Sequence, residues 1–168
     1  IGVDNFSQFE SPRDEFLKNF NKHKKEGIHH FYEEDYKIFF KNFEKKNKKI
    51  DFYFYDGDHS YKDHYDNLEI ADNFLYRGSI VMIDDINMPQ VENATKDFIN
   101  RSISKYKIIK EMKTANTNSH PSYWNGIMIL EKRSEHCTRT KGATPRSETE
   151  CTRMKDSRNS YSRELAVK

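Results

Sequence analysis

Residues 50–61 read IDFYFYDGDHSY, and residues 79–85 read SIVMIDD. Each stretch opens with a run of aromatic and β-branched residues, which is typical of a strand buried on both faces of a parallel sheet. Acidic residues follow each run where the strand is expected to end. Because open α/β sheets bind ligands outside the carboxyl ends of their strands, we expect both acidic clusters to lie in one crevice. Carboxylates this close together repel one another, so the pattern predicts a bound cation.

Strands and helices alternate on either side of these stretches. Hydrophobic periodicity and capping residues predict helices that begin near Ser11 and Asp35, and helices over residues 62–76 and 90–100. Gly78 is expected to provide the turn into the strand at residues 79–83. The remaining strands are predicted at residues 1–4, 28–32, 50–55, 106–112 and 126–131. This order predicts an α/β fold with a mostly parallel sheet, helices on both faces and a C-terminal antiparallel hairpin.

Length and composition restrict the class of protein. The chain of 168 residues has room for one domain, and its aromatic fraction of 14% supplies a core. The net charge is only +2 and the lysines are scattered, so no nucleic-acid partner is expected. We also expect a cytoplasmic protein with no membrane partner, because no apolar run approaches the roughly 18 residues of a transmembrane helix and no secretion signal is visible. A homo-oligomer is compatible with the sequence.

The composition changes near residue 134. All 12 Phe residues precede it, and the basic residues change from 17 Lys and 4 Arg to 3 Lys and 5 Arg after it. Residues 134–168 contain too few apolar side chains to offset the entropy of ordering. We therefore expect a domain over residues 1–133 and a disordered tail over 134–168. The tail is either a basic segment for an anionic partner or, given the abrupt change in composition, a non-native extension.

The two acidic motifs carry a family resemblance. The acid-Gly-x-His-x-Tyr run at residues 56–61, Gly78 and the paired Asp84 and Asp85 resemble the class I S-adenosylmethionine-dependent methyltransferases. The similarity is greatest to the macrocin O-methyltransferase-like group of sugar O-methyltransferases and covers residues 1 to 132. It implies a Rossmann-like fold and methyl transfer to a hydroxyl of a sugar or other small molecule. It also implies that the family's first strand and glycine-rich turn are missing, which would leave neighbouring strand edges unpaired.

The resemblance implies roles for individual residues. In that family a divalent cation, usually Mg²⁺, is bound by the first acid of the first motif and by both acids of the second, which are Asp56, Asp84 and Asp85 here. Asp4, Asp35 and Asp56 are the implied cofactor-binding residues. The first of these would hydrogen-bond the ribose hydroxyls of S-adenosylmethionine, and the second would lie near its adenine.

Methyl transfer to a hydroxyl also requires a base. A neutral alcohol is a poor nucleophile unless its proton leaves as attack proceeds. A cation held by carboxylates would bind the acceptor oxygen and lower its pKa. Asp58 and His59, on the turn after the first strand, are the candidate bases, and Asp58 is favoured by its expected direction into the crevice.

Other interpretations of the same residues remain open. Asp56, Gly57 and Asp58 also form an Asp-x-Asp triplet, which in nucleotide-sugar glycosyltransferases holds a metal and a diphosphate. A non-catalytic methyltransferase remnant is a further alternative, and it would bind metal without binding cofactor. Acids at these positions are also common in turns and helix caps, and His59 is more often a structural hydrogen-bonding residue than a base.

Overall fold

A computed structural model describes residues 1–7, 12–102, 105–115, 125–133 and 164–165. Along the chain its elements are β1 (Gly2–Val3), α1 (Arg13–His23), β2 (Phe31–Tyr32), α2 (Tyr36–Glu44), β3 (Ile50–Tyr55), α3 (Tyr61–Asp72), β4 (Leu75–Asp84), α4 (Pro89–Arg101), β5 (Tyr106–Met112), β6 (Ile127–Lys132) and β7 (Glu164–Leu165). None of the described helices is long and apolar enough to cross a membrane.

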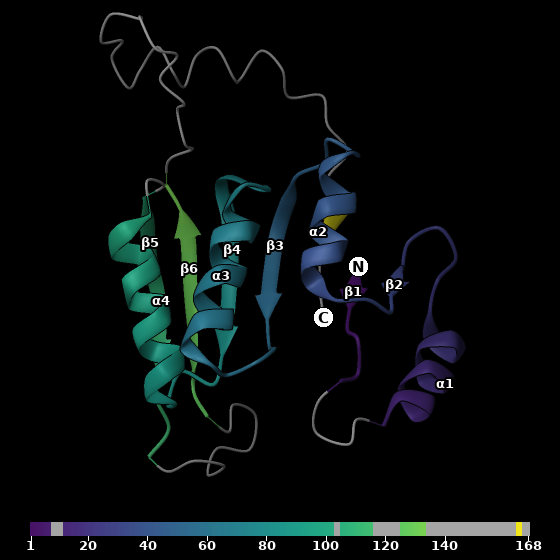
Figure 1. Cartoon of the computed structure of the whole chain (residues 1–168), viewed down its shortest axis with the longest axis horizontal. Coiled ribbons are helices and arrows are strands. Elements are labelled where there is room, and N and C mark those ends of the chain that lie inside the picture. The colour runs from purple at the N-terminus through teal and green to yellow at the C-terminus, as the bar shows by residue number, and fades with distance from the viewer. Residues whose placement is uncertain (8–11, 103–104, 116–124, 134–163, 166–168) are drawn as a thin grey trace, which may run out of the picture.

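The strands form two sheets (Figure 1). The larger has the order β5-β6-β4-β3-β7, in which β3 runs parallel to β4 and β7 while β6 runs antiparallel to β4 and β5. The smaller consists of the parallel pair β1 and β2. The predicted α/β fold with a mostly parallel sheet and a C-terminal antiparallel hairpin is therefore confirmed.

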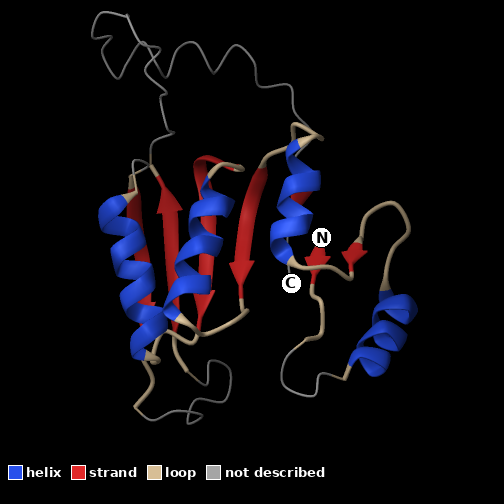
Figure 2. Ribbon diagram, viewed as in Figure 1, coloured by secondary structure: helices blue, strands red, loops and turns tan. Residues whose placement is uncertain are grey.

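Three helices pack against the larger sheet and form one core with it. The inward positions of α2 are Phe39, Phe40 and Phe43, whose spacing places them on one helix face, and all three are buried. Val81 of β4 and Leu130 of β6 pair directly and contribute to the same buried cluster. Figure 2 shows α3 and α4 in front of the sheet, with their axes running along the strands. The core therefore holds the strand ends of β3 and β4 in a fixed position.

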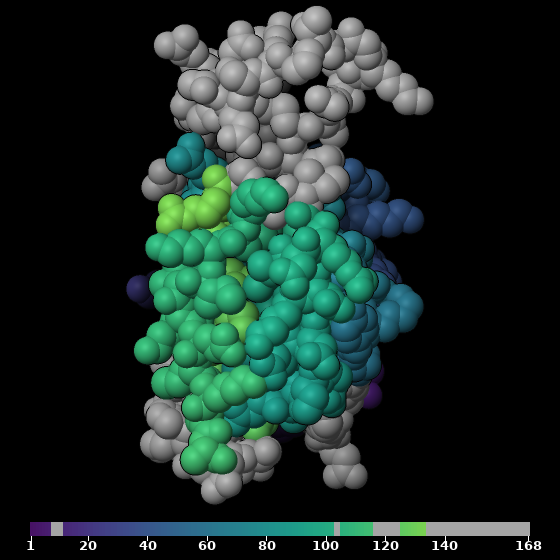
Figure 3. Space-filling model, turned by 90° about the vertical axis from the view of Figure 1, so that its left-hand side faces the viewer, coloured from purple at the N-terminus to yellow at the C-terminus, as the bar shows by residue number. Residues whose placement is uncertain are grey.

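The β5 edge of the sheet is tied to α4 at the surface. Figure 3, which looks onto this side of the molecule, shows the two elements next to each other. Glu92 of α4 accepts hydrogen bonds from Lys113, which directly follows β5, and from Lys96, both at 2.5 Å. Ion pairs at such exposed positions add little stability, so the buried core carries the packing.

The predicted helix over residues 62–76 is too long. It ends at Asp72, and β4 begins at Leu75, so Gly78 lies inside the strand instead of in a turn before it. The register between β3 and β4 shifts here, because β4 has more residues than β3 between two successive paired positions. Gly78, which lies among these extra residues, has a φ of 94°. The hydroxyl of Ser79 bridges the irregularity, because it accepts from the backbone N–H of Tyr76 at 3.0 Å and donates to the carbonyl of Ile50 at 2.7 Å. This β-bulge extends the strand backwards to Leu75.

Pairing between the two sheets is absent among the described residues. The β3 edge that faces β1 pairs only with β7, at Ile50 with Glu164 and at Phe52 with Leu165. The rest of the predicted disordered tail, residues 134–163 and 166–168, lies outside the described residues, so its disorder remains a prediction.

Candidate functional site

The acidic motifs meet because β3 and β4 run side by side in the same direction. Tyr55 pairs with Ile83 at the end of both strands, which places Asp56 and Asp84 next to each other at the carboxyl edge. After Asp56 the chain turns into α3, whose first turn is capped by Ser60; the Ser60 hydroxyl accepts from the backbone N–H of Asp63 at 3.3 Å. The structure therefore brings the two motifs together at one edge of the sheet.

Asp85 has an unusual backbone conformation. Its φ is 57°, in the left-handed region that an L-residue other than glycine adopts at a cost. The Asp85 carbonyl accepts from the backbone N–H of Met88 at 2.9 Å, which closes the turn into α4. Its carboxylate is held at both oxygens, with Oδ2 2.7 Å from Nε2 of His59 and Oδ1 2.6 Å from Nδ2 of Asn125. The left-handed turn thus aims the Asp85 side chain at the motif after β3.

Three residues at this edge have the spacing of a metal site. Asp56, His59 and Asp85 each offer one ligand atom, and these atoms lie within 4.8 Å of one another. All three are half-buried. Carboxylate oxygens suit hard divalent cations such as Mg²⁺, and an imidazole nitrogen is also accepted by Mn²⁺ and other transition metals. The chemistry of these donors therefore fits a divalent cation.

Asp84, an implied metal ligand, is not one of these three residues. Its Oδ1 accepts from the backbone N–H of Asp85 at 2.9 Å. Burial raises the pKa of the Asp84 carboxyl, and the negative charges of Asp85 and Asp56 raise it as well. Asp84 is thus close enough to both acids to feel their charge, and its role as a metal ligand stays a prediction.

The two candidate bases occupy the turn between β3 and α3. Asp58 accepts from the backbone N–H of Ser60 at 2.6 Å through Oδ1, and its carbonyl accepts from the Tyr55 hydroxyl at 3.3 Å. These contacts show that Asp58 shapes the turn, as the alternative interpretation expects. His59 contacts Asp85 as described above. Both side chains line the same cavity, so both stay candidates.

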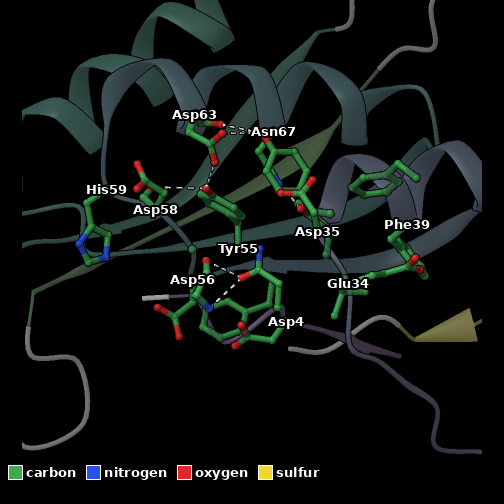
Figure 4. A pocket seen from close by; sticks show the side chains of 18 of the residues that line it. Asp4, Glu34, Asp35, Phe39, Tyr55, Asp56, Asp58, His59, Asp63 and Asn67 are labelled. Carbon is green, nitrogen blue, oxygen red and sulfur yellow. Dashed lines mark hydrogen bonds between the residues drawn. The ribbon is translucent and has the colours of Figure 1, made fainter. Parts of the chain in front are cut away.

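A cavity of about 800 Å³ joins the predicted site residues (Figure 4). Besides the turn after β3 and Asp85, it is lined by Asp4 and Asp35. Asp4 accepts from the backbone N–H of Phe6 at 2.8 Å, and Asp35 caps α2 by accepting from the backbone N–H of Lys37 at 2.8 Å. All the predicted site residues except Asp84 therefore border one cavity.

The structure adds cavity residues that the sequence did not reveal. Asp63 of α3 accepts from the Tyr36 hydroxyl at 2.9 Å and from Lys37 at 3.0 Å, which ties α2 to α3. Burial, and then the bond to Asp63, raise the pKa of Tyr36, so its phenol stays neutral. Asn67, one turn further along α3, accepts from the Tyr53 hydroxyl at 2.6 Å. The sequence did contain a signal for these cavity residues. The polar side chains at positions 63 and 67 are four residues apart and therefore lie on one face of the helix.

Two buried polar atoms at the cavity have no hydrogen-bond partner within the described part of the chain. They are Nδ2 of Asn67 and Oδ1 of Asn125. Both residues line the cavity. Native proteins pair nearly all such atoms, so each exception calls for a ligand, a water or a functional reason.

The buried side chain of His64, whose ring packs against Tyr55 at the end of β3, leads us to expect that the fold loses stability in acid. His64 is 2% exposed, and its Nε2 lies 3.0 Å from the Thr95 hydroxyl, which itself donates to the Val91 carbonyl. Burial lowers the pKa of His64 from 6.5 to about 4. Between these pH values the unfolded chain binds a proton that the folded chain does not. Stability that is complete above pH 6.5 is therefore lost as pH falls towards 4, by about 3 kcal/mol.

Urea unfolding at pH 7.5 and pH 4.5 measures this effect. The difference between the two pH values should shrink by most of that amount in His64→Gln, which keeps a donor but does not titrate. The exposed His30, changed to Gln, serves as the matched control and should leave the difference as in the wild type. An equal pH response in His64→Gln and the wild type would contradict the assignment.

Two solved structures with TM-scores above 0.5 illustrate this fold. A SAM-dependent methyltransferase from Streptococcus mutans superposes with a TM-score of 0.56 and 14% identity over 77% of this chain. The structure of SMU.776, described as a methyltransferase in complex with SAH, gives the same TM-score and identity over 77% of this chain. CalS11, a TDP-rhamnose 3'-O-methyltransferase of calicheamicin biosynthesis, has 18% identity over 77% of this chain, 57% coverage of its own chain and a TM-score of 0.49.

The chain is short beside these structures, since it covers 37% and 38% of the first two. No curated protein matches it by sequence. The sequence model of the methyltransferase domain family matches residues 1–86, which is about half of the chain and includes both acidic motifs. The chain therefore belongs to the methyltransferase domain family.

Proposed function

We propose that the chain acts in S-adenosylmethionine-dependent methyl transfer to a hydroxyl, assisted by a divalent cation, Mg²⁺ by preference. The observation that carries this proposal is the grouping of Asp56, His59 and Asp85 at the carboxyl ends of β3 and β4, within a domain of the methyltransferase family. A cavity of about 800 Å³ adjoins the group and extends to the end of β1. Its volume suits a cofactor together with part of a small acceptor.

The metal would be held by the carboxylates of Asp56 and Asp85, with Asp84 as a further proposed ligand. A divalent cation held by these residues would supply the positive charge that lowers the pKa of the acceptor hydroxyl. The protein's own contribution is orientation. Asp85 is fixed by the left-handed turn and by its two hydrogen-bonding partners, so its carboxylate is in position before any ligand arrives.

The cofactor would lie along the acidic side of the cavity, where it supplies the methyl group. Asp4 and Asp35 border this side and would accept hydrogen bonds from the ribose and adenine, as the resemblance implies. Each already accepts one bond from a backbone N–H, which fixes the direction of its carboxylate. A fixed acceptor pays less entropy on binding than a mobile one.

The proton of the acceptor hydroxyl would pass to Asp58 or His59. His59 is oriented by Asp85 and Asp58 by the backbone of Ser60, so both are held at the cavity wall. Loss of a general base typically costs about 10²- to 10⁴-fold in rate. Asp58→Asn and His59→Gln, compared at saturating Mg²⁺, therefore identify the base as the one whose variant loses rate while S-adenosylmethionine affinity is kept.

Equilibrium dialysis with labelled S-adenosylmethionine and with a labelled nucleotide sugar tests the proposed function. We expect retention of S-adenosylmethionine alone, and methyl transfer to a polyhydroxylated acceptor that stops with chelator and returns with Mg²⁺. Retention of the nucleotide sugar instead would favour a glycosyltransferase that uses Asp56 and Asp58. Metal binding without any cofactor retention would show a non-catalytic remnant.

A further inference from the structure

We propose that Asn125 is a positioning residue of the acidic site. Its amide NH₂ fixes the Asp85 carboxylate, and its amide oxygen accepts a hydrogen bond from an O–H group bound in the cavity. This inference rests on the proposed metal site. Asn125 comes from the segment that enters β6, forty residues after Asp85, and neither acidic motif points to it.

The backbone around Asn125 is packed against the turn that carries Asp85. The carbonyl of Asn125 accepts from the backbone N–H of Asn87 at 2.6 Å. The following residue, Gly126, has a φ of 77°, and a Cβ there would lie 2.6 Å from the Met112 carbonyl and 2.8 Å from Oδ1 of Asn87. Only glycine fits this close approach. The loop before β6 and the turn after β4 therefore hold each other in register.

The orientation of the Asn125 amide follows from its neighbour. Oδ1 of Asp85 lies 2.6 Å from the nearer amide atom, and a carboxylate only accepts hydrogen bonds. That amide atom must therefore be the NH₂ group, because the opposite orientation would press two oxygens together. Oδ1 of Asn125 then points elsewhere, is buried, and finds no partner among the described residues.

The NH₂ group and the oxygen of the Asn125 amide would have different roles. The NH₂ group donates to Oδ1 of Asp85, and Oδ2 is the oxygen that contacts His59. Asn125 is one of the residues that line the cavity, and its amide oxygen, which is buried and has no partner among the described residues, can only accept. A buried acceptor without a donor is unfavourable, so its complement in the bound state is a hydrogen-bond donor, and we assign this donor to an O–H group because the proposed reaction brings such groups to the cation. A water on the cation and a hydroxyl of the acceptor share this chemistry.

Substitution by an apolar side chain of similar size removes both ends of the amide. In Asn125→Leu we expect the Mn²⁺ dissociation constant, measured by electron paramagnetic resonance without acceptor, to rise about tenfold to a hundredfold. The matched control is Asn73→Leu, an exposed residue at the far end of α3. Asn125→Ser, with a shorter polar side chain, should show the same loss and covers the case in which the leucine variant does not fold.

The acceptor KM separates the two sources of the O–H group. A KM that rises in Asn125→Leu at saturating Mn²⁺ assigns the bond to the acceptor's hydroxyl, and an unchanged KM assigns it to a cation-bound water. The inference is overturned if the folded Asn125 variants bind Mn²⁺ within twofold of the wild type, or if Asn73→Leu loses as much. A wild-type chain without Mn²⁺ affinity would overturn the proposed metal site as well, which distinguishes the two failures.

Discussion

Asp85→Asn should weaken Mn²⁺ binding by more than about a hundredfold. That exceeds the loss usually seen when only a hydrogen-bonding partner of a metal ligand is removed, because here a charged ligand itself is lost. Asparagine is also the substitution that best preserves the fold, since it tolerates the left-handed φ of 57° at this position. The change in affinity therefore reports on the carboxylate alone.

Isothermal titration with MnCl₂ measures this loss. Asp14→Asn is the matched control, because it removes the same charge at a carboxylate that is 96% exposed and outside the cavity. We expect the control to bind Mn²⁺ as the wild type does. Equal affinities for Asp85→Asn and Asp14→Asn would show that long-range charge, and not a ligand at the ends of β3 and β4, attracts the ion.

Lys132→Met should cost about 3–5 kcal/mol of stability, the amount typical of breaking a buried ion pair. Lys132 is 2% exposed in β6, and its ammonium lies 2.8 Å from Oδ1 of Asp72. It also donates to the carbonyls of Asp72 at 2.8 Å and Leu75 at 3.1 Å. Removing the ammonium takes this donor away from the Asp72 carboxylate and from two backbone carbonyls at the junction of α3 and β4, and the Tyr106 hydroxyl remains as a donor to Oδ1 of Asp72.

Urea unfolding measures the cost of this substitution. Lys62→Met is the control: Lys62 pairs with Asp66 in the same way, but its side chain is 83% exposed, and it should cost less than about 0.5 kcal/mol. The double variant Lys132→Met with Asp72→Leu should recover part of the loss, because an apolar pair needs no donor. A loss under 1 kcal/mol in Lys132→Met would contradict the buried pair.

The sequence predicted the layers of the fold because local signals and long-range packing agree there. The aromatic run of β3 demands a place inside a sheet, and the four-residue spacing of phenylalanines in α2 demands burial of one helix face. The carboxyl-end rule for parallel sheets then placed Asp56 beside Asp84. None of these steps required knowledge of a distant partner.

The predictions from sequence were wrong or incomplete where contacts between residues far apart in the chain determine the structure. The start of β4 depends on the bond from Ser79 to Ile50, twenty-nine residues apart in sequence, so periodicity extended the preceding helix too far. His59 joins the metal-binding group because Asp85 takes a left-handed turn, which has no clear sequence signature at a non-glycine residue. Asn125 reaches Asp85 only through the hairpin of β5 and β6.

Anomalous diffraction from crystals soaked in MnCl₂ would test the proposed cation site directly. We predict one strong peak per chain at the carboxyl ends of β3 and β4, within bonding distance of carboxylate oxygens of Asp56 and Asp85. A peak elsewhere would contradict a metal-assisted reaction at this site. So would electron density that shows no ion and an unchanged contact between His59 and Asp85 at saturating Mn²⁺.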